Sequence, residues 1–220
     1  MQDYRINESY KQLRTNIEFS GEENKIIAIT SCTPSEGKST VSLSTAYSLA
    51  EAGKKVLFID ADLRKSVLAG RYKITGEMKG LTHFLSGQGD LSEILCKTNE
   101  KGLFVIFAGP VPPNPAELLG SKKFAALLKE ARNIYDYIII DTPPLGSVID
   151  SAIVSAVCDA AILVISANTI SYKFARSVKD QLAKTGCNIL GVVLNKVSMK
   201  QNKYYGKYYG KYYGHYGSDK

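Results

Sequence analysis

The sequence contains no tryptophan, two histidines and four cysteines in 220 residues. The cysteines lie far apart and none forms a Cys-x-x-Cys pair, so the sequence predicts neither a zinc site nor a disulfide framework, and we expect reduced thiols. With so few histidines no histidine-based catalytic pair is available. We expect His83, which stands between apolar neighbours, to be a packing residue.

Long apolar runs are also missing. The longest, Ala160 to Ala167, has the length of a strand, whereas a membrane span needs about 18 to 20 apolar residues. The N-terminus has no signal-peptide pattern. We therefore expect a soluble, cytoplasmic chain, whose length suits one α/β domain with a short appendage at each end.

Acidic residues are scarce only near the C-terminus. The net charge is +7, but residues 196–220 hold six lysines and one aspartate, while residues 1–195 hold 22 basic and 20 acidic residues. The positive charge therefore belongs to the tail, and nucleic acid is not among the partners that we expect.

One stretch carries specific chemistry. Residues 31–40 read Ser-Cys-Thr-Pro-Ser-Glu-Gly-Lys-Ser-Thr, after the apolar run Ile26–Ile29 and before a segment of helical composition. A strand, a tight loop and a helix are the context of a phosphate-binding loop, whose N–H groups face the phosphates. Lys38 would reach the β- and γ-phosphates and Ser39 would ligate Mg²⁺. We expect the nucleotide to be bound by Thr33, Pro34, Ser35, Glu36, Gly37, Lys38, Ser39 and Thr40.

Two features leave alternatives open at this loop. Cys32 stands where the first glycine of the common motif falls, and an ordinary strand-to-helix turn is the less favoured interpretation. Asn195 follows the last expected strand, where its amide is either an adenine contact or part of a plain turn.

Two further apolar strands end in aspartate. Val56–Ile59 precedes Asp60, Asp62 and Arg64, and Tyr137–Ile140 precedes Asp141. Wholly apolar strands lie inside a parallel sheet, and residues just past their C-terminal ends face the ligand crevice. Asp141 has the form of the carboxylate that holds Mg²⁺ through its water shell, while Asp60 and Asp62 would share the metal or orient a nucleophile. A polar loop is the alternative for that pair. The predicted metal set is Ser39, Asp60, Asp62 and Asp141.

The remaining chain alternates between strand and helix patterns. We expect further strands at Leu103–Phe107, Ala161–Ser166 and Ile189–Leu194. Helices are expected at about Ser39–Ala52, Gly80–Leu85, Leu91–Leu95, Pro115–Ala131 with Asn114 as its cap, from about Ser147, and Ser171–Thr185. This alternation predicts an α/β fold with a doubly wound, mostly parallel sheet and helices on both faces.

The two ends of the chain differ from this body. Residues 3–19 carry apolar side chains at helical spacing, which predicts an amphipathic helix docked on the domain. The apolar set is Ile6, Tyr10, Leu13 and Ile17, and the charged face is Glu8, Lys11 and Arg14. Spacing alone favours a solvated role for that face.

At the C-terminus, Lys-Tyr-Tyr-Gly repeats three times from Lys203 to Gly214. The segment lacks the aliphatic residues needed to bury a face, so we expect flexibility. Residues 203–216 hold seven of the 14 tyrosines: Tyr204, Tyr205, Tyr208, Tyr209, Tyr212, Tyr213 and Tyr216. We divide the chain into residues 1–20 (helix), 21–196 (nucleotide-binding domain) and 197–220 (tail).

Together these motifs make the chain resemble the bacterial tyrosine kinases that regulate capsule and exopolysaccharide synthesis, in the Gram-positive form whose kinase is separate from its membrane activator. The resemblance covers essentially the whole chain. It rests on the phosphate loop, the tyrosine cluster, Asp141–Pro144, Gly109–Pro115, and Phe58–Arg64, which is similar to the family's second Walker motif.

The resemblance implies a P-loop NTPase fold of the MinD/ParA-like superfamily and an MgATP-dependent protein-tyrosine kinase. If the chain acts as such a kinase, Lys38 neutralises phosphate charge, and Asp62 orients the phenol of the acceptor tyrosine or accepts its proton. Asp60 assists at the metal and Arg64 supports the loop. The tail tyrosines are the implied phospho-acceptors, modified mainly between subunits.

Residues 8–16 are similar to the family's ExxRxxRxN oligomer motif, with Lys11 at the first arginine position. The resemblance therefore replaces the interpretation of this face as solvent-exposed. It implies a subunit interface of a homo-oligomeric ring, made by Glu8, Lys11, Arg14 and Asn16. It also implies a transmembrane activator that recruits the chain to the inner face of the cell membrane, and a cognate tyrosine phosphatase.

The alternative is the related class of dimerising ATP switches that position division or partition machinery and have no kinase activity. Those proteins carry a lysine directly after the first P-loop position, where this chain has Thr33. A cluster of terminal tyrosines has no role in such a switch, so the hypothesis of a tyrosine kinase is favoured.

Overall fold

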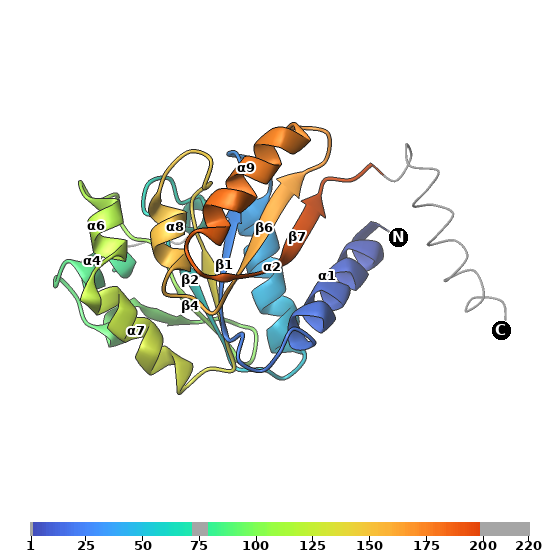
Figure 1. Ribbon diagram of the computed structural model, residues 1–220. Coiled ribbons are helices and arrows are strands. Elements are labelled where there is room, and N and C mark those ends of the chain that lie inside the picture. Colours follow the sequence, from blue (N-terminus) through green and yellow to red (C-terminus); the bar gives the residue numbers. More distant parts are fainter. Residues whose placement is uncertain (1, 72–78, 199–220) are drawn as a thin grey trace, which may run out of the picture.

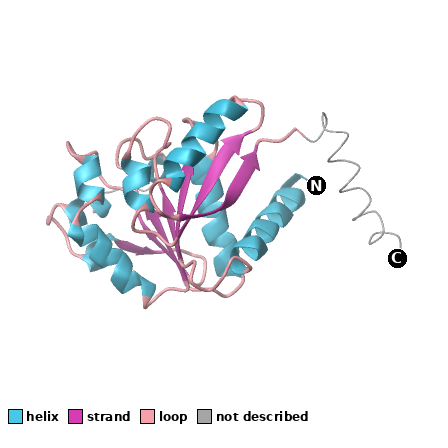
Figure 2. Ribbon diagram, in the orientation of Figure 1, coloured by secondary structure: helices cyan, strands magenta, loops and turns pink. Residues whose placement is uncertain are grey.

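The computed structural model describes residues 2–71 and 79–198, so the predicted phospho-acceptor tyrosines lie outside the described residues. The described chain forms a seven-stranded sheet in the order β3-β4-β2-β5-β1-β6-β7, with helices on both faces (Figures 1 and 2). The strands are β1 (Ile26–Ser31), β2 (Val56–Asp60), β3 (Leu95–Lys97), β4 (Leu103–Ile106), β5 (Tyr137–Asp141), β6 (Ala160–Ser166) and β7 (Asn188–Asn195). The helices are α1 (Gln2–Glu18), α2 (Lys38–Glu51), α3 (Leu68–Arg71), α4 (Leu81–Leu85), α5 (Leu91–Ile94), α6 (Pro115–Leu119), α7 (Lys122–Arg132), α8 (Asp150–Ser155) and α9 (Tyr172–Ala183).

The sheet is parallel except for β3, which pairs antiparallel with β4 at one edge. Every residue of β1 and β2 is buried, as expected for central strands covered on both faces. The predicted doubly wound, mostly parallel α/β fold is therefore confirmed.

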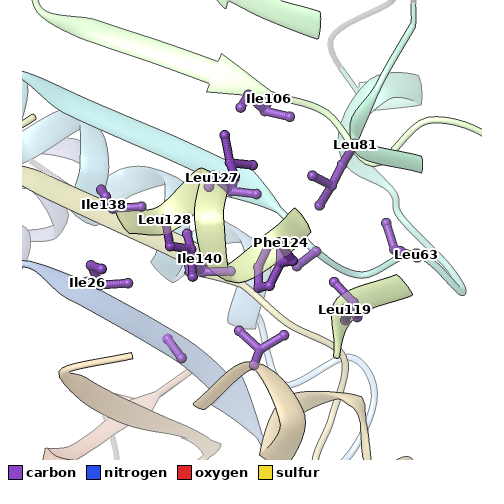
Figure 3. Packing of buried hydrophobic residues seen from close by; sticks show 14 of the residues in the cluster. Ile26, Leu63, Leu81, Ile106, Leu119, Phe124, Leu127, Leu128, Ile138 and Ile140 are labelled. Carbon is purple, nitrogen blue, oxygen red and sulfur yellow. The ribbon is translucent and has the colours of Figure 1, made fainter. Parts of the chain in front are cut away.

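Two apolar cores flank the sheet. One lies beneath α4 to α9; Figure 3 shows Phe124, Leu127 and Leu128 of α7 packed near Ile138 and Ile140 of β5. The other lies beneath α1 and α2 and takes the alternate side chains of the same strands. Alternation of one strand between two cores is the reason that the strands read as continuous apolar runs.

The order of the strands builds the site. β1 lies between β5 and β6, and β2 is the other neighbour of β5. Asp60 at the end of β2 is in register with Asp141 at the end of β5. Since parallel strands end at the same edge, the loops that follow β1, β2 and β5 meet there.

Several local predictions need correction. Leu95, expected in a helix, begins the short edge strand β3. The helix expected over Pro115–Ala131 is broken between α6 and α7, because Ser121 caps α7 by accepting a hydrogen bond from the Phe124 N–H (3.2 Å). The helix expected from Ser147 begins at Asp150.

Two side chains also act differently from expectation. Asn114 is at the N-cap of α6, but its amide donates to Glu117 (2.8 Å) and does not cap the backbone. His83 is half-buried, and its Nδ1 accepts from the Gly80 N–H (3.1 Å) at the start of α4. It is therefore a helix cap as well as a packing residue.

Only part of the apolar face of α1 is docked. Ile17 is buried and Leu13 half-buried against the second core, whereas Ile6 is 48% exposed. The Arg14 guanidinium donates to the Ser48 carbonyl of α2 (2.9 Å), which fixes the C-terminal half of α1. The expectation that Ile6 docks is wrong. In the part of the chain that the structure describes, no helix has the length and apolarity to cross a membrane.

Candidate active site

The loop between β1 and α2 has the conformation that a phosphate-binding loop needs. Ser35 (φ 64°) and Gly37 (φ 88°) both adopt left-handed backbone angles just before α2 begins at Lys38. A Cβ on Gly37 would lie 2.2 Å from the Asn195 amide nitrogen, and side chains rarely adopt this backbone angle, so glycine is favoured here. The N-terminus of the 14-residue helix α2, whose first N–H groups have no acceptor within the helix, faces the loop.

Glu36 holds this loop from behind. The residue is 2% exposed, and its carboxylate accepts hydrogen bonds from the Thr33 N–H (2.7 Å) and the Ser166 N–H at the end of β6 (3.2 Å). A buried carboxylate between two backbone donors fixes the loop relative to the sheet.

The end of β7 holds the same loop from the side. The Asn195 amide donates to the Glu36 carbonyl (2.9 Å), and the Lys196 ammonium donates to the Ser35 carbonyl (2.6 Å). Asn195 is thus beside the nucleotide loop, but its amide is bonded to that loop. Adenine contact by Asn195 stays a prediction.

Lys38 lies between the carboxylates that the sequence singled out. Its side chain is 7% exposed, and its ammonium is 2.8 Å from Asp141 Oδ1 and 3.8 Å from Asp62 Oδ2. It also donates to the Ser39 hydroxyl (3.2 Å). Ser42 of α2 donates to the same Asp141 oxygen (2.8 Å).

Asp60 is buried behind Lys38, Asp62 and Asp141. It is fully buried, and it accepts from the Ser66 hydroxyl (2.5 Å) and from the Asp62 N–H (3.2 Å). Burial, reinforced by the negative charge of Asp141, raises the pKa of Asp60 to about 7.

Asp62 is the carboxylate that faces the open side. One oxygen accepts from the Lys65 N–H (3.0 Å), which closes a tight turn, and the other is the oxygen near Lys38. The orientation of Asp62 therefore depends on the turn of residues 62–65.

Arg64 in that turn is anchored by an ion pair that the sequence did not reveal. Its Nε and Nη2 donate to the two oxygens of Asp150, at 2.7 and 2.9 Å, and Asp150 is fully buried at the first turn of α8. This hydrogen-bonded pairing raises the pKa of Arg64 further, so the guanidinium stays charged. The pair ties the loop after β2 to the segment after β5.

These loops surround an open cavity of about 340 Å³. One wall is the phosphate loop, and the other is formed by the segments that follow β2 and β5. The lining residues are Ser31, Pro34, Ser35, Gly37, Lys38, Ser39, Thr40, Asp62, Arg64, Lys65, Val67, Pro143, Pro144, Ser147 and Val148.

The residues present fit a magnesium ion bound together with nucleotide phosphates. Asp141 Oδ2 is buried and has no hydrogen-bond partner among the described residues, so one carboxylate oxygen is unsatisfied beside the phosphate loop. Mg²⁺ is commonly held by one or two carboxylates together with waters and substrate phosphates. Within the described ranges, no group of three or more His, Cys, Asp or Glu side chains is placed to hold a metal by itself.

Comparison with known proteins gives the family of this site. Residues 24–189 match the model of the AAA domain family. The tyrosine-protein kinase CpsD of Streptococcus agalactiae is 52% identical over 191 residues, covering 87% of this chain and 82% of that relative. The chain belongs to the bacterial tyrosine kinases of the capsule type.

Solved structures agree with this assignment. The kinase domain of the Escherichia coli tyrosine kinase ETK has a TM-score of 0.83 at 35% identity, covering 90% of this chain and 78% of that one. The septum site-determining protein MinD of Pyrococcus horikoshii, complexed with Mg-ADP, has a TM-score of 0.68 at 26% identity, covering 80% and 72%. The kinase thus shares the P-loop NTPase fold of MinD, while its relatives carry tyrosine kinase activity.

The fold brings most of the predicted site residues of this bacterial tyrosine kinase to one cavity. Thr33 and Glu36 support the loop from outside the cavity, Asp60 and Asp141 are buried behind it, and Asn195 is not among its lining residues. The catalytic, nucleotide and metal roles of these residues remain predictions. Sequence reasoning missed Asp150 and Ser42. The spacing of Asp150 from Asp141 carries no motif, whereas Ser42 one turn after Lys38 was readable as a helix neighbour.

The predicted interface residues lie on α1, away from the cavity. Lys11 and Glu8 form an exposed ion pair (2.7 Å), and Asn16 is exposed. Arg14 is bonded to α2 of its own chain. Their role between subunits is still a prediction.

Proposed function

We propose that this bacterial tyrosine kinase transfers the γ-phosphoryl group of ATP to tyrosines of its own C-terminal segment, and so regulates capsular or extracellular polysaccharide synthesis and export. The observation that carries the proposal is that Lys38 lies between Asp62 and Asp141 beside the phosphate loop, with Lys38 and Asp62 lining the cavity.

In the proposed step the phenol oxygen of the acceptor forms a bond to the γ-phosphorus, and the bond from that phosphorus to the β,γ-bridging oxygen breaks. ADP leaves with the bond's electron pair, and the phenol proton passes to Asp62. Transfer through a loose transition state depends mostly on positioning and charge neutralisation. Magnesium, when bound, supplies further neutralisation of the phosphate charge, and Ser39 and Asp141 are the residues that would hold it.

Each side chain has a role that follows from its place. Lys38, held between two carboxylates and nearly enclosed, neutralises charge at the transferring phosphate. Asp62 orients the acceptor hydroxyl, while Asp60, hydrogen-bonded to the Asp62 N–H, supports Asp62 and the metal site. Arg64 fixes the turn that carries Asp62.

The acceptor tyrosines are proposed to be modified mainly between subunits of a ring whose contacts include α1. Exposed ion pairs contribute only about 0–1 kcal/mol each, so a ring built on such pairs should be salt-sensitive. We propose that the cytoplasmic end of a transmembrane activator stimulates the kinase and recruits it to the membrane, and that a cognate phosphatase reverses the modification. Adding the activator's cytoplasmic peptide to the purified kinase tests the activator: unchanged ATP affinity and turnover would reject it.

Mass spectrometry of the full chain after incubation with MgATP tests the main proposal. We expect phosphate on tail tyrosines in the wild type and a loss of about 100-fold or more in rate for Lys38→Met, because a preorganised cation at the reacting phosphate is removed. Lys129→Met, at an exposed position of α7, is the matched control and should label normally. ATP hydrolysis without any tyrosine phosphate in the wild type would contradict the proposal.

A further inference from the structure

The cavity has two halves of different chemistry. The phosphate-loop half offers N–H groups and Lys38, which suit a triphosphate. The opposite half is lined by Arg64, Val67, Pro144 and Val148, and Val67 is 47% exposed. Apolar side chains contribute nothing to binding phosphate, so the triphosphate does not explain this half.

Arg64 in this half is held in one orientation. Two of its nitrogens donate to both oxygens of the buried Asp150, so the edge of the guanidinium that carries Nε and Nη2 is occupied. The side chain is nevertheless 41% exposed and lines the cavity. A guanidinium with an occupied edge can still offer its flat face, and such faces stack on aromatic rings.

We propose that Arg64, Val67 and Val148 form the acceptor subsite, in which the ring of a tyrosine from residues 203–216 packs against the Arg64 guanidinium and the two valines. A tyrosine side chain fits because its ring is apolar and flat while its hydroxyl must reach Asp62, which lines the same cavity. Asp150 is a positioning residue that fixes the guanidinium plane.

The C-terminal segment is the occupant for a geometric reason. Lys196 binds the carbonyl of Ser35, which is itself a lining residue, so the chain leaves the domain at the rim of this cavity. The residues beyond it hold seven tyrosines and can extend roughly 80 Å at about 3.3–3.6 Å per residue. This length reaches the cavity of the same subunit and that of a neighbour, and the inference rests on the proposed function, in which that segment is the acceptor, mainly between subunits.

The test uses full-length kinase whose seven tail tyrosines are replaced by serine, so that its own tail does not compete. The substrate is a synthetic peptide with the sequence of residues 203–216. Val67→Ala should raise the KM for this peptide about 3- to 10-fold, with little change in the KM for ATP, because the substitution removes two methyl groups that would pack against the tyrosine side chain. Val157→Ala, at a similarly exposed valine outside the cavity lining, is the matched control and should change neither.

The ion pair is tested separately. Arg64→Lys keeps the charge but removes the flat face, and should raise the peptide KM about 3- to 30-fold. Asp150→Asn should raise the same KM. The double variant Arg64→Lys/Asp150→Asn should be no worse than Arg64→Lys alone, since Asp150 acts through Arg64. Additive losses in the double variant would overturn the positioning role.

Direct binding separates this inference from the proposed function. A fluorescent peptide of residues 203–216 with every tyrosine changed to phenylalanine should bind the kinase–nucleotide complex, and Val67→Ala should weaken that binding as it weakens the KM. The serine version of the peptide should bind much more weakly. Equal binding of the two peptides overturns the acceptor subsite even if tyrosines are phosphorylated. Tighter binding of the phenylalanine peptide than of the serine peptide, without phosphate transfer to tyrosine, would support the subsite and refute only the proposed transfer.

Discussion

Replacing Asp60 by asparagine should stabilise the metal-free protein at neutral and higher pH. Asp60 is fully buried, and burial together with the charge of Asp141 raises its pKa from 3.8 to about 7. The folded state therefore keeps a proton on Asp60 at pH values where the unfolded chain has lost it. The contribution of Asp60 to the stability of the wild type therefore falls as the pH rises from about 4 to about 7, and levels off above that.

The size of the effect follows from the shift. One pKa unit corresponds to about 1.4 kcal/mol, so an ionised Asp60 costs up to about 4 kcal/mol of folding free energy at pH 8, and about 2–3 kcal/mol of this penalty arises between pH 5 and pH 8. The asparagine side chain of the variant carries no charge and avoids the penalty. For a chain of this size, about 2 °C or more of melting temperature corresponds to each kcal/mol.

Thermal unfolding in EDTA at pH 5, 6, 7 and 8 measures the difference between Asp60→Asn and the wild type. The difference should grow with pH and reach at least about 5 °C at pH 8. Asp180→Asn, on the exposed surface of α9, is the control and should show no such trend. A difference that is equal at pH 5 and pH 8, or a variant less stable than the wild type at pH 8, would refute the reasoning.

Two further perturbations test the loop packing and the oligomer. Gly146→Ala should lower the free energy of unfolding by about 1–3 kcal/mol and weaken ATP binding, because its Cβ would lie 2.2 Å from the carbonyl oxygen of Cys32 in the phosphate loop. Gly70→Ala is the control, since the space around its new Cβ is open, and it should change neither unfolding nor ATP titrations. Equal effects of the two substitutions would contradict the clash. A Glu8→Ala/Arg14→Ala variant should sediment as smaller species than the wild type at low salt, and identical monomeric profiles for both proteins would exclude the interface.

The strands and the phosphate loop were predictable because their signals are local. An apolar run such as Ile138–Ile140 reports burial on both faces, and Gly37-Lys38-Ser39 follows such a run, Ile26–Ile29, after a short loop. Errors occurred where a single side chain decides. The break before α7 depends on the Ser121 hydroxyl bonding to a backbone N–H, and a serine inside a helix-forming stretch permits either a cap or a helical residue.

The docking of α1 shows a different limit. Apolar spacing states which face of a helix can be buried, but not how much of it meets a partner. Ile17 meets the core, while Ile6, on the same face, is half exposed. Ile6 and Ile17 have the same helical periodicity, so the sequence pattern does not distinguish them. The position of α2 decides which of the two is buried.

The sequence by itself determined the fold class, the nucleotide loop, the aspartates beside it and the kinase family, because strand periodicity and short motifs are encoded within a few consecutive residues. Only the tertiary structure showed that Asp150, 86 positions after Arg64, holds the guanidinium in the active-site turn. It alone also showed that Lys38 is enclosed between Asp62 and Asp141 and that the end of β7 binds the phosphate loop. These contacts join separate loops, and their pairing depends on the order of strands in the sheet, which no local pattern of residues specifies.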